Sequence, residues 1–478
     1  MWRVIWASGA ILWLCGRGLA DASSHLSQAL DFDAADVKLW PDRSPESELS
    51  AGGAPALFEV HQVVLTVEED LAYPETERHL GEKERLLQRM SRKHGKWNEH
   101  HPRHRLLEAL RGFSHYAQTN QQELDRLKGL YSHVSKKQKA VRTTHRQPYL
   151  THRALANAAQ QLLEREVQYS KKFADVAELL AKNQDVCHDI VRNALEFYQV
   201  ERRELDEHVQ QMNAAGRGPE RVSVAQALKH FVRDWAVSGA NERDAAFPCI
   251  TKALQALYPD AGQGPVRVVL PGAGLGRLGH EIAQLKGFEV TNNEWSMYQN
   301  IAYRFLERHG RRDAHTVYPF VDSWSHHRST ADMLRPISFP EARLNTSGVV
   351  LVEGDFTTVF HGDAATFDAV VTHFFIDTAR NLMSYFDTIY RILKPGGYWI
   401  NFGPLLYGTG PFVQLSLEEI IVVAEAMGFE FQEVPQGCGE VTLPGKVVRG
   451  LEAAYGFDER ALTKNAYNAQ FWVARRRH

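Results

Sequence analysis

The sequence predicts an α/β fold built on a doubly wound parallel sheet. A β-branched apolar run at residues 265–270 ends in the glycine-rich turn 271–276, which passes at once into a helix-like segment. Further apolar runs at 288–291, 349–352, 367–372 and 398–402 alternate with helix-like segments. Alternation of this kind is typical of a parallel sheet whose ligand lies at the carboxyl ends of the strands.

The turn after the first strand is the strongest single signal. Gly272 and Gly274 have no Cβ, so the chain can turn tightly and a nucleotide-like ligand can lie against the backbone. The second strand-like run ends at Glu294, where a carboxylate can accept both hydroxyls of a ribose. The alternative for Glu294 is a structural cap of the next helix.

The third and fourth runs also end in polar or aromatic residues. Asp355 and Phe356 follow the third strand, where an acid can accept from an adenine amino group and a ring can stack on the base. This pair favours S-adenosylmethionine over the dinucleotide of a dehydrogenase. His373 follows the fourth strand and is predicted to touch the cofactor. Asp377 is a candidate substrate ligand, with a helix N-cap near Thr378 as its structural alternative.

The rest of the chain suggests four segments. A positive start, the apolar run 4–15 and the small residues before Asp21 predict a signal peptide or apolar leader over 1–20. Residues 21–80 read as a poorly ordered linker. Residues 81–245 form a helical N-terminal region that contributes to the cofactor site, and 246–478 form the Rossmann-like domain, with a closing strand at 470–474.

Composition narrows the partners. The chain has 478 residues, 44% hydrophobic content and a net charge of −3, so no global basic field indicates nucleic acid. Beyond the apolar leader, no segment resembles a membrane span. Four cysteines lack the spacing of a metal site and are not expected to form a disulfide framework. The histidine-rich stretch 94–104 is interpreted as a solvated basic face, so no metal is expected.

Several motifs together resemble the carnosine N-methyltransferase family. They are residues 231–235 with 242–244, 269–278, the Asn-Glu-Trp-Ser run at 293–296, and 374–379 with 394–407. Their order and approximate spacing match, from about residue 100 to the C-terminus. The resemblance implies a class I methyltransferase sheet. It also implies an S-adenosylmethionine-dependent enzyme that methylates an imidazole nitrogen of carnosine, giving anserine.

Site residues carry over position by position from this resemblance. Arg233, on the preceding helix, matches an arginine that reaches the methionine end of the cofactor, where a guanidinium pairs bidentately with a carboxylate. The other cofactor positions are His230, Gly272, Gly274, Glu294, Asp355, Phe356 and His373. The substrate positions are Asp377, which is also the catalytic candidate, Tyr407, Gly408 and Tyr467. Without the resemblance, Tyr407 and Tyr467 would be interpreted as packing residues.

Two departures from the family pattern affect the expected acceptor. His230 stands where the family has glutamine, and Gly408 stands where the family has a substrate-binding histidine. Three alternatives therefore stay open: a methyltransferase for another small-molecule or peptide acceptor, a non-catalytic cofactor-binding protein, and a nicotinamide dehydrogenase. A homodimer is an open assembly state. The secretory pathway is expected if the leader is a signal peptide, and otherwise the cytoplasm or nucleus, as in the family.

Overall fold

The computed structural model describes residues 75–134, 163–408, 410–434 and 437–478, together with the backbone of three N-terminal strands. The chain divides into two units after Glu68. In the first unit, β1 (Trp2–Ala7) pairs with β2 (Ala10–Cys15) and with β3 (Lys38–Leu39), both antiparallel. The other residues up to 74 lie outside the described part, so the leader and linker stay predictions. Among the described helices, none has the length and apolar character to cross a membrane.

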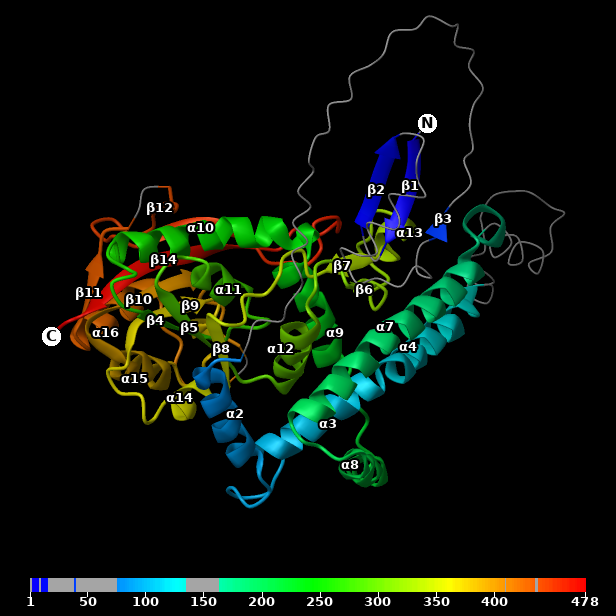
Figure 1. Cartoon of the computed structure of the whole chain (residues 1–478), viewed down its shortest axis with the longest axis horizontal. Helices are drawn as coiled ribbons and strands as arrows, with labels where there is room; N and C mark the ends of the chain where they lie inside the picture. Colours follow the sequence, from blue (N-terminus) through cyan, green and yellow to red (C-terminus); the bar gives the residue numbers. More distant parts are fainter. Residues whose placement is uncertain are drawn as a thin grey trace, which may run out of the picture. The chain divides into compact units, whose positions relative to one another are not determined.

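The second unit is built on the predicted doubly wound sheet (Figure 1). The parallel strands lie in the order β8–β5–β4–β9–β10, so the chain starts in the middle, moves to one side and then crosses to the other. β14 runs antiparallel beside β10 and carries β11 and β13 on its far edge. The strands are β4 (Val266–Pro271), β5 (Phe288–Glu294), β8 (Val349–Glu353), β9 (Phe367–His373), β10 (Leu393–Gly403), β11 (Phe429–Gln432), β12 (Glu440–Val441), β13 (Arg449–Ala454) and β14 (Ala466–Arg476).

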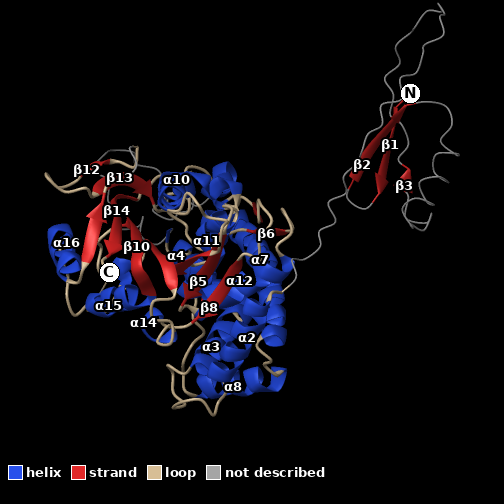
Figure 2. Ribbon diagram, turned by 60° about the vertical axis from the view of Figure 1, so that its left-hand side comes forward, coloured by secondary structure: helices blue, strands red, loops and turns tan. Residues whose placement is uncertain are grey.

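Both faces of this sheet are covered by helices, which explains why its strands read as nearly continuous apolar runs. Val268 faces α10 and α11, whereas its neighbour Val269 faces α15 and α16. Side chains alternate between the two faces because successive residues of a strand point in opposite directions. Figure 2 shows the sheet between its helical layers. The helices are α10 (Ala240–Leu257), α11 (Arg277–Ala283), α14 (Phe356–Val359), α15 (Leu382–Ile392) and α16 (Leu417–Ala426).

The helical region that precedes the sheet packs on α12 (Met297–His309) and forms a third apolar core with it. At its centre, Tyr198 donates to both carboxylate oxygens of Glu353, at 2.9 and 2.8 Å, and Arg304 donates to the same carboxylate at 3.0 Å. This buried network fastens the helices to the end of β8. The helices are α2 (Glu77–Met90), α3 (Pro102–Ser114), α4 (Tyr116–Tyr131), α7 (Tyr169–Phe197), α8 (Arg202–Ala214) and α9 (Val222–His230).

Short elements complete the second unit. A π-helical turn, η3 (Phe231–Trp235), follows α9 without a break and is joined to α10 by the 3-10 turn η4 (Val237–Gly239). A second 3-10 turn, η5 (Ile376–Thr378), follows β9. Between α12 and β8 lie β6 (His315–Val317), α13 (Thr330–Met333) and β7 (Ile337–Phe339).

The structure corrects two local expectations. Helix α2 begins at Glu77, so the linker expected to reach residue 80 ends earlier. The cysteines were not expected to pair, yet Cys249 of α10 and Cys438, between β11 and β12, form a disulfide. Spacing could not reveal this pair because 189 residues separate its members and only the folded sheet brings them together. Cys187, by contrast, is free and buried.

Loss of the disulfide should destabilise the second unit. We expect the double variant Cys249→Ser/Cys438→Ser to lower the free energy of unfolding by about 2–4 kcal/mol, because the cross-link restricts the unfolded chain. Denaturant unfolding without reductant measures the change. Wild-type protein in dithiothreitol should shift by a similar amount. Equal unfolding midpoints for the variant and the oxidised wild type would contradict the prediction.

Candidate functional site

The carboxyl ends of the parallel strands form one polar edge, and the glycine-rich turn lies at its centre. Gly272 has a φ of 68° and Gly274 a φ of 57°, a left-handed conformation that favours glycine. A Cβ at Gly272 would lie 2.4 Å from the Phe375 ring, and one at Gly274 would lie 3.3 Å from Nδ1 of His230. Both positions therefore require glycine, because a side chain there would strain the backbone and crowd the Phe375 and His230 rings.

Glu294 lies beside this turn and is already oriented. Its Oε2 accepts from the backbone N–H of Gly274 at 3.0 Å, and its Oε1 accepts from the N–H of Ser296 at 2.7 Å. Burial raises the pKa of Glu294, and these backbone donors counteract part of that effect. The remaining lone pairs of this fixed carboxylate are suited to two ribose hydroxyls.

Asp355 and Phe356 end up in different surroundings. Asp355 caps α14, with its carboxylate accepting from the N–H of Thr357 at 2.8 Å. Phe356 is buried and packs edge-on against Phe375 and Tyr385, whose rings stack on each other at 4.5 Å. Its ring is thus part of the core beneath the site. Phe375 and Tyr385, which the sequence analysis missed, extend this aromatic cluster toward the glycine turn.

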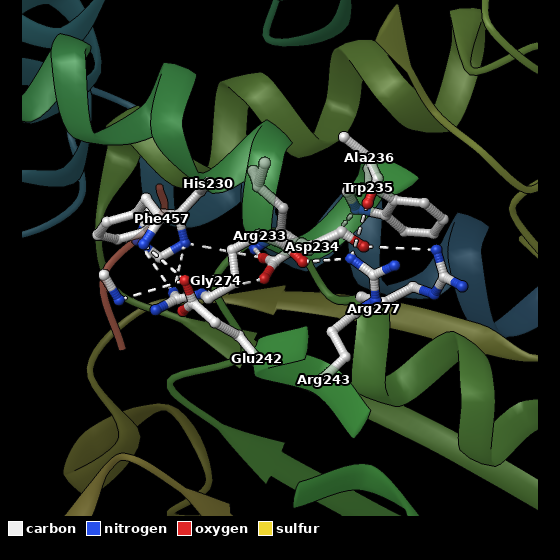
Figure 3. Close-up of polar contacts among 12 residues, drawn as sticks. His230, Arg233, Asp234, Trp235, Ala236, Glu242, Arg243, Gly274, Arg277 and Phe457 are labelled. Carbon is white, nitrogen blue, oxygen red and sulfur yellow. Dashed lines mark hydrogen bonds and ion pairs between the residues drawn. The ribbon is translucent and has the colours of Figure 1, made fainter. Parts of the chain in front are cut away.

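The π-helical turn η3 is hydrogen-bonded to the glycine-rich turn (Figure 3). Asp234 accepts from the N–H of Leu275 at 3.1 Å, and the Trp235 indole donates to the carbonyl of Leu275 at 2.8 Å. In a π-helical turn the backbone hydrogen bonds join residues five positions apart, and such turns often occur at functional sites. Here it lets two consecutive residues bind one residue of the turn. The sequence analysis did not assign Asp234 to the site.

Arg233 projects from the same turn toward the site. Its guanidinium lies over the Tyr455 and Phe457 rings, at 4.7 and 4.8 Å. One edge donates to Asp234 at 3.3 Å and to Nδ1 of His230 at 2.8 Å. Burial and the Arg233 charge lower the pKa of His230, in keeping with a neutral ring that accepts this bond.

One nitrogen of Arg233, Nη1, is buried and makes no hydrogen bond of normal geometry within the described structure. Burial alone would lower the pKa of Arg233, but the nearby Tyr455 hydroxyl helps to raise it. A buried, unsatisfied donor of this kind is costly unless something else binds it. A cofactor carboxylate beside the glycine turn would satisfy it. The side-chain-free turn, the fixed Glu294 carboxylate and this donor together fit S-adenosylmethionine.

A second group of residues lies on the other side of this edge. Asp377, in η5, is buried, and its Oδ2 accepts from the N–H of Leu406 at 3.1 Å. Burial raises the pKa of Asp377 to about 6. Phe374, between β9 and η5, stacks on Tyr455 at 4.8 Å and meets the Tyr467 ring at 6.0 Å. These three rings form an aromatic wall at the segment that leads into η5.

The other predicted residues on this side differ in their surroundings. His373 packs against Phe247, and burial followed by the Arg233 charge lowers its pKa to about 3. Its Nε2 is buried without a hydrogen-bond partner among the described atoms. The Tyr407 hydroxyl donates to the Leu415 carbonyl at 2.8 Å, so it has a structural role within its own loop. A Cβ at Gly408 would meet nothing within 4 Å, which leaves open space there.

A family model described as carnosine N-methyltransferase matches residues 212–478, more than half of the chain. This chain belongs to the carnosine N-methyltransferase family. The rat carnosine N-methyltransferase (Rattus norvegicus) is 35% identical over 292 residues, which is 59% of this chain and 71% of the rat protein. The Schizosaccharomyces pombe enzyme of the same name is 32% identical over 276 residues, 53% of this chain and 70% of that protein.

Family membership confirms the resemblance, the methyltransferase activity and S-adenosylmethionine as cofactor. It excludes the dehydrogenase alternative. The Rossmann-like fold is confirmed by the strand order. A solved phosphoethanolamine N-methyltransferase 2 from Haemonchus contortus, in complex with S-adenosyl-L-methionine, shares 16% identity over 44% of this chain and 43% of that chain. Its TM-score is 0.29. So low a score adds nothing to the strand order.

The roles of the individual site residues stay predictions, and Arg233 offers the most direct test. We expect Arg233→Lys to weaken S-adenosylhomocysteine binding about 10–100-fold, since lysine cannot make the paired hydrogen bonds of a guanidinium and charged hydrogen bonds contribute about 1.5–3 kcal/mol. Calorimetric titration measures the dissociation constant. Arg221→Ala, at the start of α9, is the matched control and should bind as wild type. Unchanged binding by Arg233→Lys would remove Arg233 from the cofactor site.

Proposed function

We propose that the chain methylates a ring nitrogen of an imidazole-containing dipeptide, with carnosine as acceptor and anserine as product. The observation that carries the proposal is the buried carboxylate of Asp377, three residues after Phe374, whose ring packs with those of Tyr455 and Tyr467. An imidazole has an N–H for a carboxylate and a flat face for aromatic rings. The relatives' names point to the same acceptor.

The chemistry needs positioning more than a strong base. S-adenosylmethionine supplies a methyl group on a positively charged sulfur. A neutral imidazole nitrogen already carries the lone pair that forms the new N–C bond while the C–S bond breaks. The site must hold nucleophile, methyl and sulfur in line and exclude water. The cofactor end of this line is fixed by Arg233, Glu294 and the glycine turn. The acceptor is oriented by Asp377 and the aromatic wall.

The negative charge of Asp377 also suits the positive charge that develops on the acceptor ring. The ring becomes a cation as the bond forms, and a carboxylate bonded to its opposite N–H stabilises that cation and selects the reactive tautomer. The proton of that N–H can then pass to the Asp377 carboxylate and on to water.

Open space at Gly408 favours a second candidate within the same class. The resemblance places a substrate-binding histidine at this position, and here no side chain fills it. An acceptor bulkier than carnosine, such as another histidine-containing peptide, would fit this departure. A comparison of turnover with carnosine and with another histidine-containing peptide decides between the two acceptors.

Asp377→Asn tests the acceptor site. We expect wild-type protein to transfer a radiolabelled methyl group to carnosine, and the variant to lose about 100-fold or more in kcat/KM while binding S-adenosylhomocysteine unchanged. Loss of cofactor binding as well would mean that the substitution damages the fold. Cofactor binding without transfer to carnosine in the wild type would contradict carnosine as acceptor and favour the other peptides.

The pH dependence gives an independent readout of the same residue. Because the pKa of Asp377 is raised to about 6, its carboxylate ionises as pH rises through this value. An acceptor imidazole must be neutral, and its ordinary pKa is about 6.5. Wild-type log kcat/KM should therefore rise with a limiting slope of two below these values, and that of Asp377→Asn with a slope of one. Equal slopes would show that Asp377 does not titrate in the reaction.

We further propose that the protein folds in an oxidising compartment, as the expected signal peptide would require. The Cys249–Cys438 disulfide supports this, because structural disulfides persist in the secretory pathway and are rare in the cytosol. Peptide mapping of protein isolated from its native cells, with thiols blocked at lysis, should recover the two cysteines as one cross-linked peptide pair. Recovery of both as blocked thiols would contradict the proposal.

A further inference from the structure

The loop between β13 and β14 carries a residue in an unfavourable backbone conformation directly against the cofactor arginine. Phe457 has a φ of 60°, in the left-handed region that is unfavourable for a residue with a side chain. Its ring lies 4.8 Å from the Arg233 guanidinium and 5.3 Å from the His230 ring. Other contacts must hold this conformation in place.

Glu242, in the first turn of α10, provides those contacts. Its Oε1 accepts from the N–H of Gly456 at 3.2 Å and from the N–H of Phe457 at 2.5 Å, across more than 210 residues of sequence. Two consecutive backbone N–H groups aimed at one anion form a concave binding site called a nest. Figure 3 shows the Glu242 carboxylate between Phe457 and Arg233.

The rest of the loop has its own attachments. Leu462 donates its N–H to the His326 carbonyl at 2.7 Å, and Asp458 pairs with Arg335 at 2.5 Å. These contacts fix the outer part of the loop to the segments on either side of α13. The inner part, at Gly456 and Phe457, is held by Glu242. A change at Glu242 should therefore release Phe457 without unfolding the loop.

The charge balance around Glu242 agrees with this role. The residue is buried, and burial raises its pKa, while the Arg233 charge and the two backbone donors counteract that effect. Its second oxygen, Oε2, is buried without a hydrogen-bond partner among the described atoms. The contacts on which the residue depends are thus the two N–H groups. They need an oxygen acceptor, which an amide supplies as well as a carboxylate does.

We infer that Glu242 is a positioning residue for the cofactor site: it holds Phe457 against Arg233 and so fixes the orientation of the guanidinium, whose Nη1 has no hydrogen-bond partner among the described atoms. The Phe457 ring packs on the guanidinium, and the contacts with His230 and Asp234 hold one edge of the guanidinium. The inference concerns cofactor binding, so it does not depend on which acceptor the enzyme uses.

Calorimetric titration of the full chain with S-adenosylhomocysteine tests the inference. We expect Glu242→Ala to raise the dissociation constant about 10-fold or more. Glu242→Gln keeps an oxygen that accepts both N–H groups and should stay within about threefold of wild type. Asp244→Ala removes an exposed carboxylate from the same turn and is the matched control. In turnover, Glu242→Ala should raise KM for S-adenosylmethionine while kcat at saturation changes little.

Phe457→Ala keeps the inference falsifiable if Glu242→Ala fails to fold. It should weaken binding about as much as Glu242→Ala, and the double variant should be no weaker than either single variant, because both changes remove one effect. Wild-type affinity in either single variant would overturn the inference. A Glu242→Gln variant as weak as Glu242→Ala would also overturn it, because the charge of Glu242 and not its bonds to the loop would then be what matters.

Discussion

The attachment of Asp234 to the glycine-rich turn is the contact on which the cofactor site depends. One oxygen of this buried carboxylate accepts from the N–H of Leu275, and the other accepts from Arg233. Burial alone would raise the pKa of Asp234, but His230 and Arg233 hold it well below its ordinary value. The carboxylate stays charged, so it positions the turn and compensates the arginine at once. Removing one partner of such a buried pair leaves an uncompensated charge, which is strongly destabilising.

The sheet explains why this attachment is needed. Parallel strands end at one edge, so the glycine turn, Glu294, Asp355 and Asp377 gather there whatever the helices do. The side chains at this edge are carboxylates, which accept hydrogen bonds. A cofactor that has a carboxylate of its own also needs a cation to bind it. We propose that Arg233 supplies this cation from outside the sheet, on the helical region that the Glu353 network fastens to β8. In this proposal the helical region and the sheet form one binding site.

The sequence predicts the part of the site that depends on local order. Gly272, Glu294 and Asp377 each follow a strand, and a strand end can be recognised from a few neighbouring residues. Phe356 shows the limit of this reasoning: its position after the third strand is right, but tertiary packing turns its ring into the core against Phe375 and Tyr385. The Cys249–Cys438 disulfide and the Glu242 contacts were not predicted, because each joins residues about 190 or more positions apart.

The charged groups on the two sides of the site differ in whether they are paired, and this difference suits methyl transfer. On the cofactor side, Arg233 is compensated by Asp234, so a bound carboxylate meets a cation that the fold has already neutralised in part. Near the aromatic wall, Asp377 stands without a cationic partner in the described structure, and burial raises its pKa. A carboxylate in such surroundings gains most when a cation forms beside it, because charges interact more strongly away from water. In the proposed reaction the acceptor ring becomes that cation only as the bond forms, so we expect Asp377 to favour the transition state over the neutral ring.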